Sequence, residues 1–226
     1  MITVSESVFQ AYPSACFGAL VAHGLATPTD RARMDALESD VLAGIRAAHA
    51  TYERKAFAAT APACHYVTFY KQFTKTYHVL LQLESVLLKG KGIPPAGVPI
   101  EMMFLAELKN LLLTAVHDMD AVEGALTVRV ATGDETYTGM SGEERHPYAG
   151  DLYLADESGI LSDIVYGPDA RTQITDTTAT ALYFVFGVEG ITADDIRRHL
   201  EDVRAFLTTG LPEAVCDPIE VFHRVN

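Results

Sequence analysis

The sequence predicts an α+β fold, in which helices dominate the first half of the chain and strands dominate the second half. From about residue 30 to residue 114, apolar side chains recur three and four positions apart, as on one face of a helix. From residue 124 to 188, short apolar or alternating runs are separated by turn residues. A further helical segment closes the chain. No repeat or linker interrupts this order, so we expect a single domain over residues 1–226.

The first half is expected to hold one buried strand and three helices. The apolar run 14–26 predicts the strand. A long amphipathic helix follows it and should end near Thr60, before Pro62. Two more helices are predicted over 76–89, with Gly90 as the stop, and over 99–114. The lysines and glycines after residue 88 therefore mark a helix end and a turn rather than a phosphate-binding loop.

The second half reads as short strands followed by a capped helix. Two strands are expected on either side of residues 132–134, and a hairpin over 151–167 should turn at residues 157–159. The continuous apolar run 178–188 predicts a buried strand. Thr192, with Asp195 three residues later, is a helix N-terminal signature, so we expect a helix over 193–208.

The charge is distributed unevenly along the chain. The formal net charge is −13, and residues 121–226 contain 7 arginines, no lysine and 19 acidic residues. An acidic second half repels the phosphate backbones of nucleic acids at long range, which argues against tight, non-specific nucleic-acid binding. Any contact with RNA should therefore use the first half of the chain and a few selected arginines.

Three cysteines and the lack of long apolar runs indicate the compartment. Cys16, Cys64 and Cys216 are odd in number and far apart, which argues against a disulfide framework and favours a reducing cytoplasm. There is no pattern of a signal peptide, and no apolar run approaches the roughly 20 residues of a membrane span. We expect a cytoplasmic protein without a membrane partner.

The stretch His117-Asp118-Met119-Asp120 places an imidazole and two carboxylates within four residues. It can be a metal site, a catalytic pair in which Asp118 orients His117 as a base, or the polar corner between a helix and a strand. Its composition favours the polar corner. The chain has none of the paired Cys or His spacings of a zinc site and no calcium loop, so we expect no metal and no cofactor.

A second candidate site lies in the polar loop 167–179. Arg171 is its only arginine, with Thr172 and Thr175 close by in sequence. Arg171 is either a solvated loop residue or an anion clamp to which the two threonines add hydroxyl groups.

In the order and spacing of its motifs, the chain resembles the free-standing B3/B4 domain, which also occurs within the beta subunit of bacterial phenylalanyl-tRNA synthetase. The resemblance covers roughly residues 66–187 and rests on residues that match the family pattern: Asn110, Asp118, Asp120, Gly124, Asp156, Arg171 and Thr175. It implies an α+β fold with a β-sandwich of unusual topology flanked by helices. In the synthetase this domain is the editing site, which hydrolyses the ester of tyrosine wrongly attached to the phenylalanine tRNA.

The resemblance implies an aminoacyl-tRNA deacylase rather than a full synthetase, with the 3′ end of aminoacyl-tRNA as its partner. His117 and Asp118 are the catalytic candidates, and a set of neighbouring residues is expected to bind substrate: Asn110, Arg171, Thr172 and Thr175. Two positions depart from the family, because Ala115 replaces a histidine and Phe184 replaces a glutamate. The alternative is a non-catalytic module of the same fold that binds tRNA, an amino acid or a protein. The sequence does not determine the oligomeric state.

Overall fold

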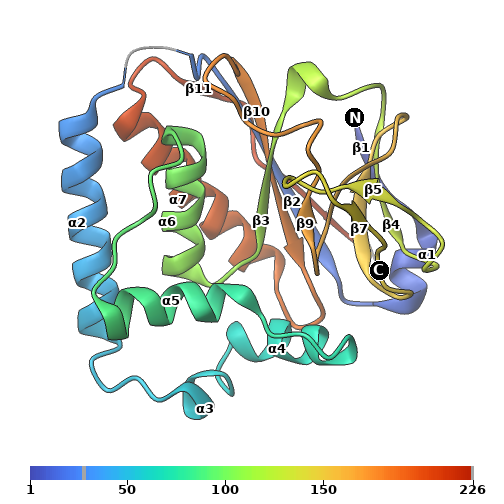
Figure 1. Cartoon of the computed structure of the whole chain (residues 1–226), viewed down its shortest axis with the longest axis horizontal. Helices are drawn as coiled ribbons and strands as arrows, with labels where there is room; N and C mark the ends of the chain where they lie inside the picture. Colours follow the sequence, from blue (N-terminus) through green and yellow to red (C-terminus); the bar gives the residue numbers. More distant parts are fainter. Residues whose placement is uncertain (27–28, 225–226) are drawn as a thin grey trace.

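The computed structural model describes residues 1–26 and 29–224, and within them helices pack beside two β-sheets (Figure 1). The helices are α1 (Glu6–Ala11), α2 (Arg31–Ala48), α3 (Arg54–Phe57), α4 (Ala63–Gln72), α5 (His78–Lys89), α6 (Val98–Asn110), the 3₁₀ turn η1 (Met119–Ala121) and α7 (Ala193–Gly210). The strands are β1 (Ile2–Val4), β2 (Cys16–His23), β3 (Thr114–Asp118), β4 (Leu126–Val130), β5 (Tyr137–Thr138), β6 (Glu144–Arg145), β7 (Leu152–Ala155), β8 (Ile160–Asp163), β9 (Gly167–Pro168), β10 (Thr180–Gly187), β11 (Val215–Cys216) and β12 (Glu220–His223). The predicted α+β class is confirmed.

The strands form two larger sheets and one small ribbon in the described part of the chain. One sheet has the order β1-β4-β7-β8-β9, in which β1 runs parallel to β4 and the other pairs are antiparallel. The other sheet has the order β11-β2-β10-β3, and β12 also pairs with β2. Strands β5 and β6 pair only with each other within the described residues. Both large sheets therefore include strands from the beginning of the chain, besides those from its second half.

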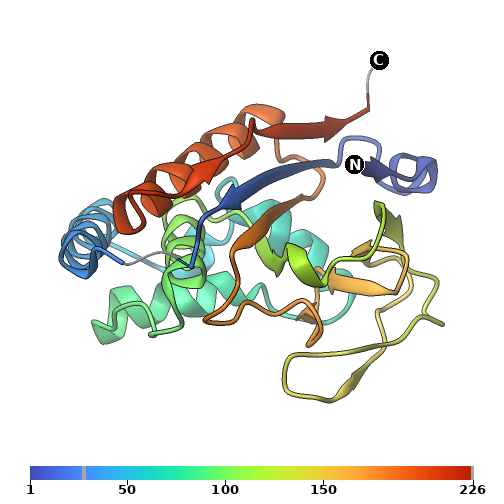
Figure 2. The same cartoon turned by 90° about the horizontal axis from the view of Figure 1, so that it is seen from above.

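The second sheet is covered by helices on one face and by the first sheet on the other. Figures 1 and 2 show α7 lying along β2 and β10, with α2, α5 and α6 on the same side of the molecule. Gly18 on β2 faces α7, and a Cβ atom added there would lie 2.2 Å from Ile196. On the opposite face, His117 of β3 reaches Ser162 of β8 in the first sheet. The apolar core runs through both layers.

Several predicted elements are confirmed, and others need correction. Helix α5 ends at Gly90, which has a left-handed φ of 64°. Helix α7 has the predicted capping box, and β7 and β8 form the predicted hairpin. The long second helix is wrong in length, because α2 ends at Ala48 and α3 is a separate turn. Strands β4 and β5 flank residues 132–134 as predicted, but they pair with other strands rather than with each other.

The most important correction concerns the region after α6. The predicted helix over 99–114 ends at Asn110, and Leu111 takes a left-handed conformation with φ 56°. The chain then enters β3, which the sequence analysis does not predict. His117 and Asp118 therefore lie at the end of a strand, so the expected corner between a helix and a strand is wrong.

Candidate functional site

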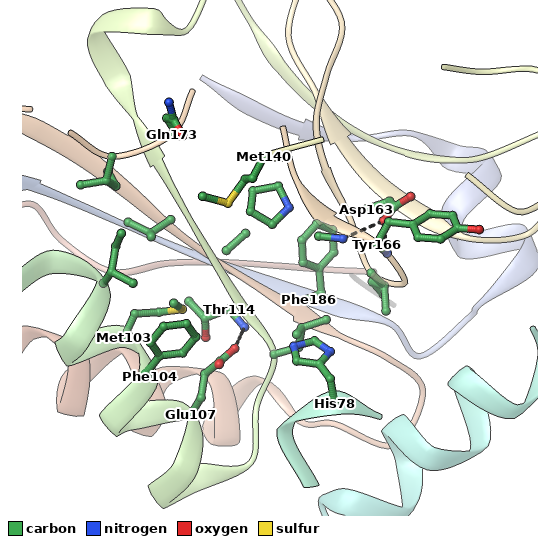
Figure 3. A pocket seen from close by; sticks show the side chains of 18 of the residues that line it. His78, Met103, Phe104, Glu107, Thr114, Met140, Asp163, Tyr166, Gln173 and Phe186 are labelled. Atoms are coloured by element: carbon green, nitrogen blue, oxygen red, sulfur yellow. Dashed lines mark hydrogen bonds between the residues drawn. The ribbon is translucent and has the colours of Figure 1, made fainter. Parts of the chain in front are cut away.

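A cavity of about 520 Å³ lies beside β3 (Figure 3). Its walls come from α5, α6, β3, the end of β8 with β9, and residues 173–174. Most lining side chains are apolar, including Met103, Phe104 and Phe186. A mostly apolar cavity with a few polar groups is the usual form of a small-ligand site. A hollow of about 830 Å³ between α6 and α7 is larger, but its lining has a larger polar share.

The position of β3 creates this cavity. Among the described strands β3 pairs only with β10, so its other edge faces the cavity. The turn out of α6 is held by two bonds: the Glu107 carboxylate accepts the Thr114 N–H at 2.7 Å, and the Phe186 N–H donates to Leu113 O at 3.0 Å. These bonds bring the segment 114–116 to the same cavity as residues 173–174.

Glu107 is the most buried acidic group of this cavity, with only 1% of its surface exposed. Burial raises the pKa of its carboxyl to about 8. The charged form is disfavoured because few dipoles replace the lost water, and the single backbone N–H of Thr114 offsets only part of that loss. Glu107 is thus largely a neutral acid at pH 7.

His78, the first residue of α5, also lines the cavity. Its Nδ1 lies 3.2 Å from the Tyr70 hydroxyl, which donates to Ile164 O at 2.5 Å. Burial lowers the pKa of His78, so the neutral imidazole is the main form at pH 7. Unlike His117, His78 remains partly exposed.

Asp163, at the end of β8, contributes a second carboxyl to the cavity wall. Its Oδ1 accepts the N–H groups of Tyr166 and Gly167, which shapes the tight turn into β9. Burial raises the pKa of Asp163 to about 6, and the pKa of the neighbouring buried Asp151 is also raised.

The predicted catalytic residue His117 lies behind this cavity and is fully buried. Its Nδ1 is 2.8 Å from the Thr172 hydroxyl, and its Nε2 is 3.0 Å from the Ser162 hydroxyl. Burial, reinforced by the charge of Arg171, lowers the pKa of His117 to about 3. His117 is therefore neutral; its Nε2 connects β3 to β8 of the other sheet, and its Nδ1 contacts Thr172 of the loop.

Asp118 forms local hydrogen bonds at the end of β3. Its Oδ1 accepts the Asp120 N–H at 3.0 Å, and its Oδ2 accepts the Thr178 hydroxyl at 2.6 Å. The backbone N–H of Asp118 donates to Thr172 O at 2.8 Å. These bonds fix the loop 172–178 against β3, and this loop carries residues 173–174 to the cavity.

The other predicted binding residues lie around the cavity rather than in it. Arg171 forms a bidentate pair with Asp156 at 3.0 Å for both contacts, and it donates to Ala121 O at 2.5 Å. Thr172 is buried and donates to Asp169 as well as contacting His117. Thr175 lies in a hydroxyl cluster with Thr178, where the two oxygens are 3.3 Å apart.

Asn110 lines a separate polar groove between α6 and α7. Its amide donates to Asp202 at 2.9 Å and lies 3.2 Å from His199 Nδ1. The Nε2 of His199 contacts the Thr114 hydroxyl at 2.7 Å. Asn110 therefore connects the end of α6 to α7 and, through His199, to β3.

The two departures from the family pattern coincide in space. Ala115 on β3 and Phe184 on β10 are register partners, so their side chains lie side by side on one face. Ala115 lines the cavity. Where the resemblance leads us to expect a histidine and a glutamate, this chain has two adjacent apolar side chains, of which Ala115 is in the cavity wall.

His78 and Glu107 carry no sequence signal that marks them as site residues. His78 occurs at the start of a predicted helix, and Glu107 occurs within one, so neither has a distinctive local pattern. Within residues 1–26 and 29–224, no group of three or more His, Cys, Asp or Glu side chains is arranged to hold a metal ion.

Comparison with known proteins finds similarity to subunits of tRNA ligases. The phenylalanine–tRNA ligase beta subunit of Mycoplasma genitalium is 25% identical over 99 residues, which are 44% of this chain and 12% of that subunit. An N-terminal fragment of the phenylalanyl-tRNA synthetase beta subunit from Pyrococcus horikoshii aligns with 96% of this chain and 54% of that fragment, with 11% identity and a TM-score of 0.49. No family model matches the chain. The chain is thus similar to part of the phenylalanyl-tRNA synthetase beta subunit, as its residue pattern predicts.

Proposed function

We propose that this chain binds the aminoacyl end of a tRNA in the cavity beside β3 and hydrolyses the ester of a mischarged aminoacyl-tRNA. The observation that supports this proposal is the cavity of about 520 Å³, which brings residues 114–116 and 173–174 together. Its volume and apolar lining suit an amino-acid side chain. The similarity to a tRNA ligase subunit supports a tRNA-related role.

Ester hydrolysis does not require a nucleophilic triad or a metal. An aminoacyl ester is already activated, so a positioned water and donors for the developing oxyanion suffice. Editing is needed where binding alone separates similar side chains only about a hundredfold. A cavity with a few proton-carrying groups therefore fits this chemistry.

The second candidate is a binding module without catalysis. Ala115 and Phe184 favour it, because both are apolar where the family has ionisable residues. The burial of His117 also favours it, because both ring nitrogens already have hydroxyl partners. Such a module would hold an amino acid or an aminoacyl-tRNA without releasing the ester.

A deacylation assay distinguishes these candidates. The full chain is incubated with a panel of correctly and wrongly charged tRNAs, and release of each amino acid is followed. Selective release from a mischarged tRNA supports the editing proposal. Retention of every ester, together with binding of the charged tRNA, supports the binding module instead.

A cavity-filling variant relates the activity to this site. Ala115→Leu adds bulk at the cavity wall without removing a polar group, so it should abolish selective release. Ala59→Leu, at an exposed position, is the matched control. Full activity in Ala115→Leu would show that another surface performs the hydrolysis.

The roles predicted from the resemblance are tested in the same assay. His117 and Asp118 in catalysis, and Asn110, Arg171 and Thr172 in binding, remain predictions, as does Thr175. A His117→Gln variant keeps a hydrogen-bonding side chain between the two sheets. Loss of turnover in this folded variant would support a catalytic role, whereas retained turnover would leave His117 as a connection between the sheets.

A further inference from the structure

We propose that His78 and Glu107 form the acid–base pair of the cavity, with His78 activating water and Glu107 donating a hydrogen bond to the acyl oxygen of the ester. This inference rests on the proposed function, because it assigns the chemistry of the same cavity. Neither residue belongs to the motifs that carry the resemblance. Both side chains line one cavity, from α5 and α6 (Figure 3).

The hydrogen bonds of Tyr70 fix the tautomer of His78. Tyr70 has one hydroxyl proton, and it is donated to Ile164 O at 2.5 Å. The contact of 3.2 Å between Tyr70 and His78 Nδ1 therefore requires that Nδ1 carries the proton. In the neutral ring the lone pair then lies on Nε2, which has no hydrogen-bond partner among the described residues. This arrangement resembles other oriented bases, in which a third group holds the imidazole in one tautomer.

The hydrogen bond from Thr114 fixes which oxygen of Glu107 carries the proton. Oε1 accepts the Thr114 N–H, so in the neutral acid the proton lies on Oε2. Oε2 has no partner in the described part of the chain, and the residue is 1% exposed. A hydroxyl at this position can donate a hydrogen bond to a ligand oxygen in the cavity. Glu107 is therefore prepared to donate to a ligand that enters the cavity.

The reaction balances with water as the only co-reactant. His78 Nε2 takes a proton from water, and the water oxygen bonds to the acyl carbon. Glu107 Oε2–H donates to the acyl oxygen as negative charge develops there. The bond between the acyl carbon and the ribose oxygen then breaks, and the proton held by His78 passes to that ribose oxygen. The products are a free amino acid and a tRNA with its hydroxyl restored.

Other ionisable groups face the same space and must be separated in a pH profile. Asp163 and Tyr166 come from the β8–β9 side, and Tyr70 of α4 lies behind His78. His78 can act as a base at pH values above its own pKa, which burial lowers. Glu107 carries its proton at pH values below its pKa of about 8. Burial raises the pKa of Asp163 to about 6, so its titration can also change the rate on the acidic side of the pH profile. The variant Asp163→Asn removes this titration and measures its contribution.

The test compares His78→Gln, Glu107→Gln and Glu107→Leu on two substrates. One is a mischarged tRNA, and the other is a nitrophenyl ester of an aromatic amino acid, which needs no tRNA contact.

His78→Gln should lower kcat about 100-fold or more with KM nearly unchanged, as for the loss of a general base. Glu107→Gln keeps a neutral donor, so it should retain activity and lose the decline above pH 8. Glu107→Leu should lower kcat about 100-fold or more, as for the loss of an oxyanion donor.

Matched controls use residues outside the cavity. His146→Gln removes an exposed imidazole. Glu84→Gln removes a carboxylate of α5 that forms an ion pair with Arg54 of α3. Both should leave kcat and its pH profile unchanged. Circular dichroism and urea unfolding establish that each variant is folded before rates are compared.

The outcomes separate this inference from the proposed function. Hydrolysis of the nitrophenyl ester that depends on His78, without release from any tRNA, keeps the acid–base pair and overturns the tRNA editing role. Deacylation of tRNA that is unchanged in His78→Gln keeps the editing role and overturns the pair. Failure to hydrolyse either ester overturns both. A Glu107→Gln variant that keeps the decline above pH 8 overturns the assignment of Glu107.

Discussion

Replacement of Glu107 by glutamine should change how the stability of the protein depends on pH. Burial raises the pKa of Glu107 from an ordinary value of 4.5 to about 8. The folded state therefore binds this proton more tightly than the unfolded state, and stability is lost as the pH rises from 4.5 to 8. Each pH unit in this window corresponds to about 1.4 kcal/mol, so the loss between pH 5 and pH 9 is on the order of 4 kcal/mol.

Glu107→Gln keeps an oxygen for the Thr114 N–H and carries no titrating group, so it should escape this loss. Urea unfolding of both proteins at pH 5 and pH 9, at constant ionic strength, measures the difference directly. We expect the variant to gain on the order of 4 kcal/mol over the wild type between the two pH values. Other titrating groups are common to both proteins and largely cancel in the comparison. A difference between the proteins that stays constant with pH would refute the inferred protonation of Glu107.

Three further predictions concern the framework around the site, and urea denaturation measures each of them. Thr172→Val removes the hydroxyl at Nδ1 of buried His117 and should cost about 1–3 kcal/mol, as for an unsatisfied buried polar group; an unchanged midpoint would contradict this. Thr192→Ala removes the capping box of α7 and should cost about 1 kcal/mol, whereas no loss would mean that the cap is dispensable. Gly18→Ala places a Cβ against α7 and should cost about 1–3 kcal/mol. Gly44→Ala, with open space around it in α2, is its control and should stabilise by about 0.5–1 kcal/mol.

Local signals were sufficient for the elements that the sequence predicted correctly. The Thr192–Asp195 capping box marks the start of α7, and Gly159 marks the turn between β7 and β8. Both signals depend only on residues close together in sequence. The continuous apolar run that becomes β10 was also visible, because a strand buried on both faces needs no polar alternation.

Strand β3 was missed because its signal is tertiary. The apolar residues after Asn110 continue the composition of α6, without Gly or Pro at the boundary. The helix ends at Asn110, and the left-handed residue after it is Leu111, a residue type that rarely adopts a positive φ. Pairing with β10 and the Glu107–Thr114 hydrogen bond stabilise this break, and both depend on the folded chain.

The candidate site illustrates what a sequence signal can and cannot locate. Parts of the two segments that carry the predicted residues, 114–116 and 173–174, line the same cavity, but none of the predicted side chains does. His78 and Glu107 could not be recognised, since their burial and altered pKa values arise only when α5, α6 and β3 enclose the same space.

The pairing of β2 has a consequence for the order in which the chain folds. Strand β2 spans residues 16–23, but its partners are residues 180–187, 215–216 and 220–223. During synthesis on a ribosome, this apolar strand emerges early and has no partner until most of the chain has followed. Contacts between such distant segments slow folding and leave unpaired strand edges exposed in the meantime. We therefore expect nascent or truncated chains that lack residues 180–223 to aggregate, even though helices α1 to α6 are complete.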